Sequence, residues 1–203
     1  SHRADAKEGL SPEVEAIFRK MDRLMSDEKM QNEQLPEPFR SEVSRGVSCD
    51  ELAEATGKFG RDPRNPIPVN GPLGELIYLS NLRTTDLAPV LFHRLGSLGS
   101  VDVFETVSFD DSLWDILFLD LYHPRKSRHA PVGYQIASNK DRAQLFFGTN
   151  EFVEVFPDQL PDAIANAFER IIGVRMRPPQ VRELIERMRF SRPAAHKVAV
   201  ESV

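Results

Sequence analysis

Two histidines lie where the chain is rich in β-strand pattern, and histidine is the side chain that exchanges a proton most readily near neutral pH. His93 alternates with Leu91 and Leu95, so it shares a strand face with apolar residues. His123 follows the apolar segment 113–122. Each imidazole could act as a general acid or base in a pocket, or could be a buried histidine whose nitrogens bond to neighbouring groups.

A carboxylate, Glu105, interrupts a strand face that otherwise carries the apolar residues Val101, Val103, Val107 and Phe109. If Asp110 and Asp111 form a turn, Glu105 falls opposite Ile116 on the next strand. A carboxylate in apolar surroundings has a raised pKa and could serve as a catalytic acid or base. The alternative is that an arginine such as Arg94 reaches this carboxylate and pairs with it.

The segment 120–129 is basic, and a proline interrupts it directly after the strand pattern ends. Arg125 and Arg128 could bind a phosphate or carboxylate through their guanidinium groups, and Ser127 could add a hydroxyl donor. Arg94 is the other candidate for holding an anionic group of a substrate. The alternative is a solvated loop whose arginines pair with nearby aspartates and glutamates.

The sequence contains no recognisable metal or cofactor motif. His93, Asp120 and His123 are suitable ligand types for zinc or iron, but their spacing matches no metal-binding pattern. The glycine-containing segments lack the patterns of phosphate-binding and dinucleotide-binding loops. We therefore predict no metal and no cofactor. Cys49 is the only cysteine, and we expect a buried, unreactive thiol because no base lies near it in the sequence.

A helix is the first element that the sequence predicts. Ser11 is a suitable N-cap, Pro12 suits the first helical position, and apolar residues then recur at helical spacing until about Met30. The proline-rich residues 35–38 cannot continue this helix and are interpreted as a linker. The apolar stripe includes methionines, which favours either packing on the protein's own body or a homodimer contact with a second copy.

The middle of the chain has the apolar alternation that is typical of strands. We predict strands at 90–95, 101–109 and 113–122, a further hairpin at 145–156, and a flexible turn at 96–100. Residues 59–72 are rich in proline and glycine, which indicates a surface loop in which Ile67 and Val69 turn inward. Residues 73–82 fit either a helix or a strand.

Helical pattern returns near the end of the chain, over 158–173 and 178–190. Strands clustered between helices predict an α+β fold, with a largely antiparallel mixed sheet flanked by N- and C-terminal helices. We divide the chain into an N-terminal helix with its linker (1–38), an α+β core domain (39–157), and C-terminal helices with a tail packed on the core (158–203).

Charge and hydropathy bear on the class of partner. The formal net charge is −5, although the chain from residue 168 onward carries eight Lys/Arg against four Glu. Glutamates four residues from arginines in 182–187 can pair with them, so nucleic-acid binding is not the expected function. No apolar run is long enough to cross a membrane, and the polar first ten residues do not resemble a signal peptide. The expected compartment is the cytoplasm.

Three segments together resemble a family of uncharacterised bacterial proteins. They are the NPIPVNG loop at 65–71 with Gly74 and Tyr78 after it, the FHRLGS segment at 92–97, and the YHPR segment at 122–125 followed by Gly133-Tyr134. The resemblance covers about residues 49–136. It implies a domain core over that span, with helical extensions on both sides, and it implies no activity.

Two classes of function fit these observations. The first is a non-catalytic binding or protein-interaction module, because packing residues are plentiful and catalytic patterns are absent from the sequence. The second is a small-molecule hydrolase for an anionic substrate, with His93, His123 and Glu105 transferring protons. The second class requires those side chains to converge on one pocket.

Overall fold

A four-stranded sheet with strand order β1-β5-β4-β3 forms the centre of the computed structural model, which describes residues 11–137 and 192–196. β3 (Val90–Leu98), β4 (Val101–Ser108) and β5 (Trp114–Asp120) run antiparallel, whereas β1 (Ile67–Pro68) is parallel to β5. A second, antiparallel pair joins β2 (Leu82–Thr84) to β6 (Tyr134–Ile136). The predicted α+β fold with a largely antiparallel mixed sheet is confirmed.

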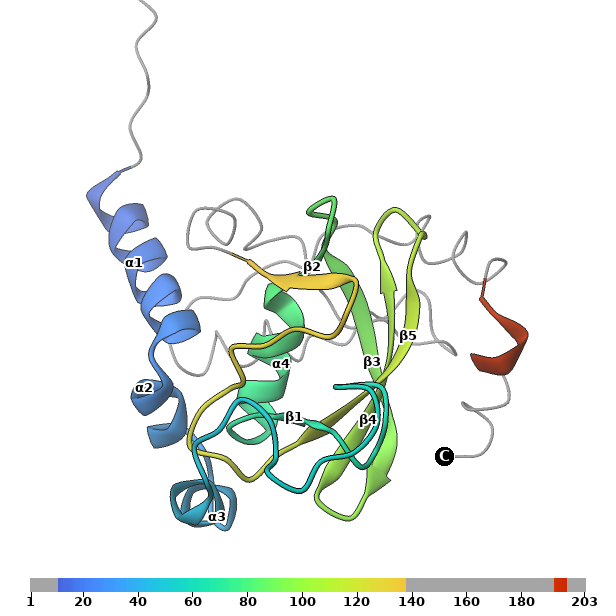
Figure 1. Cartoon of the computed structure of the whole chain (residues 1–203). Coiled ribbons are helices and arrows are strands. Elements are labelled where there is room, and N and C mark those ends of the chain that lie inside the picture. The colour runs from blue at the N-terminus through green and yellow to red at the C-terminus, as the bar shows by residue number, and fades with distance from the viewer. Residues whose placement is uncertain (1–10, 138–191, 197–203) are drawn as a thin grey trace, which may run out of the picture.

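Three helices precede the sheet and lie together on one side of the molecule (Figure 1). They are α1 (Pro12–Ser26), α2 (Glu28–Glu33) and α3 (Phe39–Arg45). The predicted N-cap is confirmed, because the Ser11 hydroxyl accepts a hydrogen bond from the Val14 amide at 3.3 Å. The predicted single helix is in fact two, because the Asp27 carboxylate caps a new helix by accepting from the Met30 amide at 3.0 Å.

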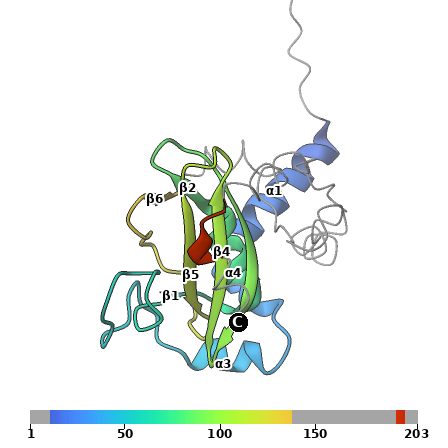
Figure 2. The ribbon, with the colours of Figure 1, turned by 90° about the vertical axis from the view of Figure 1, so that its right-hand side faces the viewer.

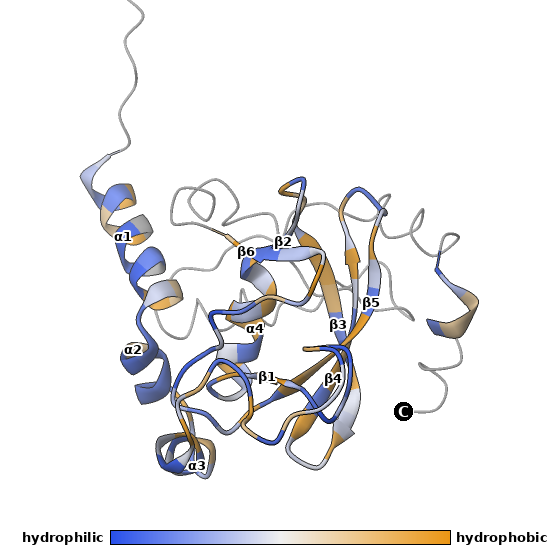
Figure 3. Cartoon of the chain, in the orientation of Figure 1, coloured by the Kyte–Doolittle hydropathy of each residue, from blue (hydrophilic) through white to orange (hydrophobic). Residues whose placement is uncertain are grey.

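The fourth helix, α4 (Gly71–Asn81), resolves the ambiguity over residues 73–82. It is apolar around most of its circumference because it is buried between the sheet and the N-terminal helices. Figure 3 shows hydrophobic residues concentrated in α4 and the central strands. One core cluster joins α4 to the inner face of the sheet, with Tyr78, Leu79, Phe92, Phe104, Leu117 and Leu119 among its members.

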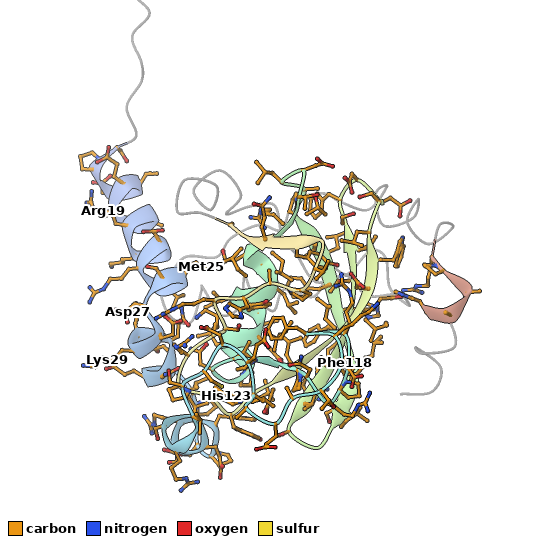
Figure 4. All side chains as sticks on the ribbon, in the orientation of Figure 1. Arg19, Met25, Asp27, Lys29, Phe118 and His123 are labelled. Carbon is orange, nitrogen blue, oxygen red and sulfur yellow. The ribbon has the colours of Figure 1, made fainter. Side chains whose placement is uncertain are left out.

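A second core cluster attaches the N-terminal helices to α4. Leu24 and Met25 of α1 pack with Leu35, Val43, Leu73 and Ile77. In Figure 4 Met25 points from α1 toward the body, whereas Arg19 and Lys29 point away from it. The C-terminal half of α1 therefore packs within its own chain.

The opposite face of the sheet contacts residues from the end of the chain. Figure 2 shows the short segment 194–196, in red, in front of β4 and β5, with α4 behind the sheet. The His196 ring lies edge-on to Trp114 of β5, with 5.8 Å between ring centroids. Arg192 and His196 also reach Glu105 of β4, so β4 is enclosed on both faces.

Two predictions about loops are wrong. Residues 65–71 are all buried, because Ile67 and Pro68 form β1 beside β5 and the Gly60 carbonyl accepts from the Phe118 amide at 2.9 Å. The predicted inward positions of Ile67 and Val69 are confirmed, since both side chains are fully buried. Residues 96–98 belong to β3, which continues past a register shift between Arg94 and Gly96.

The predicted strand register is confirmed, with Glu105 paired to Ile116. The predicted second hairpin at 145–156 and the helices at 158–173 and 178–190 lie outside the described residues. The same holds for most of the predicted C-terminal domain.

Candidate functional site

Glu105 is the most enclosed acidic side chain of the predicted site, with 0% of its surface exposed. One carboxylate oxygen accepts hydrogen bonds from His93 Nε2 at 2.6 Å and from the Arg192 guanidinium, and the other accepts from His196 Nδ1 at 3.1 Å. We call these four residues the Glu105 cluster. His93 stands directly opposite Glu105 in the β3–β4 ladder, so strand pairing alone brings those two together.

The expectation of a raised Glu105 pKa is wrong. Burial alone would raise this pKa, but hydrogen bonds from His196 and His93 and the positive charge of Arg192 lower it to about 2. Glu105 is therefore ionised at neutral pH and saturated with donors. A general acid or base needs a proton or a lone pair directed at a substrate, which this arrangement does not offer.

His123 has a separate set of partners at the other end of the sheet. Its Nε2 donates to the Asp120 carboxylate at 3.0 Å, and its Nδ1 donates to the Val47 carbonyl at 2.7 Å. The same Nδ1 lies 3.8 Å from the sulfur of Cys49. Burial lowers the His123 pKa, but the two acceptors outweigh burial and raise it, so the imidazolium form is favoured.

Cys49 is partly exposed rather than buried as expected, and the fold brings the His123 imidazole to its sulfur from 74 residues along the chain. Burial raises the pKa of the Cys49 thiol, and Asp50 and Asp120 raise it further, while Arg125 opposes the rise. The thiol therefore has a base beside it but no lowered pKa.

His93 and His123 do not converge on one pocket. His93 pairs with Glu105 of β4, and His123 bonds to Asp120 at the end of β5. Asp120 pairs with Val101, which is four residues away from Glu105 along β4. Four residues of antiparallel strand span about 13 Å. In Figure 4 the labelled His123 lies on the side of the molecule where Figure 1, in the same orientation, shows α2 and α3, whereas segment 194–196 lies on the opposite side. The predicted catalytic set is thus divided between two locations.

Three of the predicted anion-binding residues have partners within the chain. Arg94 forms two hydrogen bonds to Asp102, at 2.8 and 3.1 Å. Arg125 donates to Asp50 at 2.7 Å and to the Ser48 hydroxyl at 2.9 Å. The Ser127 hydroxyl donates to the Asp50 carbonyl at 2.7 Å.

We call residues 123–129 the basic loop. The bonds of Arg125 and Ser127 attach this loop to residues 48–50. The approach of the two segments depends on Gly46, where a Cβ would clash with the Tyr122 carbonyl oxygen. Ser127 and Arg125 are therefore already used in holding the loop in place.

Arg128 differs from the other predicted anion-binding residues. Its backbone amide donates to Asp50 at 2.9 Å, but its guanidinium makes no hydrogen bond within the part of the chain that the structure describes. Its side chain is exposed and lines a hollow of about 240 Å³. Arg128 is thus the predicted anion-binding residue that geometry leaves available for a ligand.

This hollow, the basic pocket, lies where the ends of α1 and α4 meet the basic loop and β6. Its apolar wall comes from Met25, Tyr78, Ile136 and Ala137. Its polar wall comes from the basic loop and from Ser26, Glu28 and Asn81. Apolar walls with a few polar groups are typical of small-ligand sites. The volume is slightly below the usual range for drug-sized ligands, so the pocket suits a smaller molecule.

Lys126, which we did not predict as a site residue, also lines the basic pocket. Its ammonium group donates to Gln31 and lies 3.4 Å from both Asn70 and the Glu28 carboxylate. Asn70 in turn donates to Gln31 at 2.9 Å. This buried polar network fixes the ammonium group at the pocket wall and ties the basic loop to α2.

Arg192, His196 and Asn81 were missed in the sequence analysis. No local pattern could place Arg192 beside a glutamate 87 residues earlier. Asn81 is the last residue of α4, and nothing in its immediate sequence distinguishes it from a helix-ending asparagine. The acidic Asp50 beside Cys49 was visible in the sequence, but its pairing with Arg125 depends on the fold.

Within the described ranges, no group of three or more acidic, histidine or cysteine side chains has a geometry that could hold a metal ion. Over the same residues, no helix combines the length and apolarity that crossing a membrane requires. No protein-family model matches this chain, and no curated protein or solved structure is significantly similar to it. The function is therefore argued from the geometry of the site.

Proposed function

We propose that this protein is a non-catalytic binding module whose basic pocket holds a small ligand with an anionic group. The observation that carries the proposal is the position of the Arg128 guanidinium, which lines the pocket without an intrachain hydrogen-bond partner in the described residues. A guanidinium group binds carboxylates and phosphates through paired, charge-assisted hydrogen bonds. Lys126 lines the same wall, where its ammonium group pairs with the Glu28 carboxylate at 3.4 Å.

The surroundings of the basic pocket favour binding over catalysis. Hydrogen bonds to Asp50 hold the basic loop, and the Lys126 network holds it against α2, so the pocket is assembled before a ligand arrives. A prepared site avoids the entropic cost of ordering the loop on binding. The imidazoles of His93 and His123 bond elsewhere and do not line the pocket.

The test is a panel of small carboxylates and phosphates, measured by the shift they cause in the thermal unfolding of the full chain. We expect stabilisation by at least one anion, because a ligand that binds only the folded state raises the midpoint of unfolding. Arg128→Ala should abolish that shift. Arg45→Ala, which removes one exposed arginine of α3, is the matched control and should retain the shift. Equal shifts in both variants would contradict the proposal.

Thiol-dependent hydrolysis is the second candidate function, and the 3.8 Å contact between Cys49 and His123 favours it. In this reaction the Cys49 thiolate attacks an ester carbonyl carbon, and the leaving alkoxide takes a proton from the His123 imidazolium. Water then hydrolyses the acyl thioester. Asp120 would orient the imidazole. This candidate ranks second because the Val47 carbonyl already engages His123 Nδ1 and because burial raises the Cys49 pKa.

Alkylation by iodoacetamide distinguishes an activated thiol from an ordinary one. The hydrolase candidate predicts rapid alkylation of Cys49 at pH 7 and slow alkylation in His123→Gln, because the imidazolium stabilises the thiolate. A rate that becomes appreciable only in alkaline solution, and that is equal in both proteins, would exclude the hydrolase candidate. Cys49→Ala identifies any background reaction with other side chains.

A homodimer contact through α1 remains a proposal of lower rank. It is supported by Val14, which is 36% exposed on the N-terminal half of α1. The buried Leu24 and Met25 already serve the intrachain core, so only the first half of the helix is available for a partner. Analytical ultracentrifugation of the full chain and of Val14→Asp tests this contact. We expect the full chain to form a dimer and the substitution to weaken it.

A further inference from the structure

The hydroxyl groups that line the basic pocket are already used as hydrogen-bond donors. Each of them donates to a backbone carbonyl of the chain: Ser26 to Asp22, Tyr78 to His129 and Ser127 to Asp50, all at 2.7 Å. The Lys126 ammonium group is engaged by Gln31 and Glu28. The Arg128 guanidinium is therefore the charged donor that the pocket offers to a ligand.

The backbone amides of the basic loop beside Arg128 are also occupied. The Ser127 amide donates to the Pro68 carbonyl at 2.8 Å. The Arg128 amide donates to Asp50 at 2.9 Å, and the His129 amide donates to the Ser127 hydroxyl at 3.0 Å. Phosphate sites commonly use several free backbone amides or the N-terminal end of a helix. The loop amides at 127–129 do not form such a site.

The charges around the pocket favour one negative charge on the ligand. Arg128, Lys126 and Glu28 are the charged lining residues, and Lys126 pairs with Glu28, so one positive charge remains uncompensated. α1 and α4 reach the pocket with their C-terminal ends, at Ser26 and Asn81, where the carbonyl groups carry partial negative charge. A phosphate dianion would bring a second negative charge toward these groups. A carboxylate brings one, and its two oxygens match the paired donors of a guanidinium.

The remaining wall of the pocket is apolar. Met25, Tyr78 and Ala137 are at most 9% exposed, whereas Ile136 is 36% exposed at the pocket. A hydrocarbon chain laid against this wall would be removed from water together with the exposed surface of Ile136, and burial of apolar surface is favourable. The part of the ligand beyond its carboxylate is therefore expected to be hydrocarbon.

The size of the cavity limits the length of that hydrocarbon. Its volume of about 240 Å³ corresponds to roughly eight water molecules at ~30 Å³ each. A saturated carboxylate with six carbons has about the same number of non-hydrogen atoms. Much longer chains would extend out of the pocket into water and gain nothing from the additional carbons.

We propose that the ligand of the basic pocket is a short aliphatic monocarboxylate of about four to six carbons. Its carboxylate is bound by the Arg128 guanidinium, and its chain lies against the apolar wall formed by Met25, Tyr78, Ile136 and Ala137. This inference rests on the proposed function and narrows its ligand class. Binding requires no covalent step and no cofactor.

Calorimetric titration of the full chain at constant ionic strength tests the inference with acetate, butyrate, hexanoate and octanoate. We expect the affinity to rise on the order of fourfold for each methylene from acetate to hexanoate, as for burial of a methylene group, and to level off at octanoate. Hexanamide, which lacks the charge, and inorganic phosphate, which lacks the chain, should each bind at least about tenfold more weakly than hexanoate.

Substitutions assign the two parts of the ligand to the two parts of the pocket. Arg128→Ala should weaken acetate and hexanoate by the same factor, about tenfold or more. Ile136→Ser should weaken hexanoate about threefold or more and leave acetate unchanged. Leu98→Ser is the matched control, because Leu98 is a 53% exposed apolar residue of β3 that does not line the pocket, and it should change neither affinity. The chain-length series on wild type needs no variant to fold.

The outcomes separate this inference from the broader proposal. If acetate or phosphate binds as tightly as hexanoate and requires Arg128, the aliphatic inference is wrong and the anion-binding function stands. If the affinity rises with chain length equally in wild type and Ile136→Ser, and continues to rise to octanoate, the chain lies elsewhere and the inference is wrong. If hexanoate binds equally well to wild type and Arg128→Ala, both proposals are wrong.

Discussion

Two of the imidazole–carboxylate pairs among the described residues lie in different settings, His93–Glu105 and His123–Asp120. The first pair lies within the sheet, where Arg192 and His196 complete the coordination of a fully buried carboxylate. The second lies beyond the end of β5, next to Cys49 and the basic loop. The His93–Glu105 pair therefore helps to join Arg192 and His196 to the sheet, whereas the His123–Asp120 pair anchors a loop.

This comparison shows that a histidine beside a carboxylate does not by itself indicate catalysis. In the Glu105 cluster all the donors converge on one carboxylate, so the charges compensate each other. At His123 both imidazole nitrogens have acceptors, so the ring favours its charged form. Neither arrangement lines the basic pocket, which depends on residues adjoining His123 in sequence.

The largest predicted effect is that of Glu105→Gln on stability. The substitution keeps the size of the side chain, but it removes the charge that compensates Arg192 and one of the two oxygens that accept hydrogen bonds from His93 and His196. Breaking a buried ion pair by neutralising one partner destabilises a protein by about 3–5 kcal/mol. Urea denaturation should show a loss of this order, and a loss below about 1 kcal/mol would mean that the cluster is not structurally important.

The two pairs should respond to pH in opposite directions. The Glu105 pKa is lowered from 4.5 to about 2, so its stabilising contribution is present above pH 4.5 and is lost as pH falls toward 2. At about 1.4 kcal/mol per pKa unit, the difference between wild type and Glu105→Gln should change by about 3 kcal/mol over that range.

The His123 pKa is raised above 6.5, so its contribution is complete below pH 6.5 and is lost as pH rises through the raised pKa. The stability difference between wild type and His123→Gln should therefore shrink toward alkaline pH. Urea denaturation at intervals from pH 3 to pH 9 measures both trends. Parallel trends for the two variants would contradict the distinction between the pairs.

A moderate effect is expected from Asp50→Ala, which removes the acceptor of the Arg125 guanidinium and the Arg128 amide. We expect a loss of about 1–2 kcal/mol, as for a few hydrogen bonds in a partly exposed site. Because the basic loop would loosen, ligand affinity should fall as well. Full retention of affinity would show that the loop does not need Asp50 to shape the pocket.

The smallest effect should be that of Arg45→Ala on stability. Arg45 pairs with Glu42 on the exposed face of α3, with a side chain that is 68% exposed. Exposed ion pairs contribute about 0–1 kcal/mol, so urea denaturation should show little change. A loss of unfolding free energy as large as that of Asp50→Ala would mean that exposed ion pairs stabilise this protein more than their exposure suggests.

Local features of the fold could be predicted from the sequence, whereas long-range contacts could not. Ser11 as an N-cap and the pairing of Glu105 with Ile116 follow from short-range rules on capping and turns. The burial of 65–71 was missed because proline and glycine usually mark exposed loops, and here they allow close packing beside β5.

The candidate site shows the same limit. The basic loop was predicted as an anion site, and Arg128 does line a pocket, but Arg125 and Ser127 are taken by a segment more than 70 residues earlier. The other walls come from α1, α4 and β6, which are distant in sequence. A single sequence without tertiary contacts could not show that these elements meet.

The most direct test of the binding proposal is a crystal structure of the full chain grown with the anion that stabilises it most in thermal unfolding. We predict electron density for this anion inside the basic pocket, with its carboxylate or phosphate group hydrogen-bonded to the Arg128 guanidinium. An empty pocket at a saturating concentration, or a ligand bound at another surface, would contradict it.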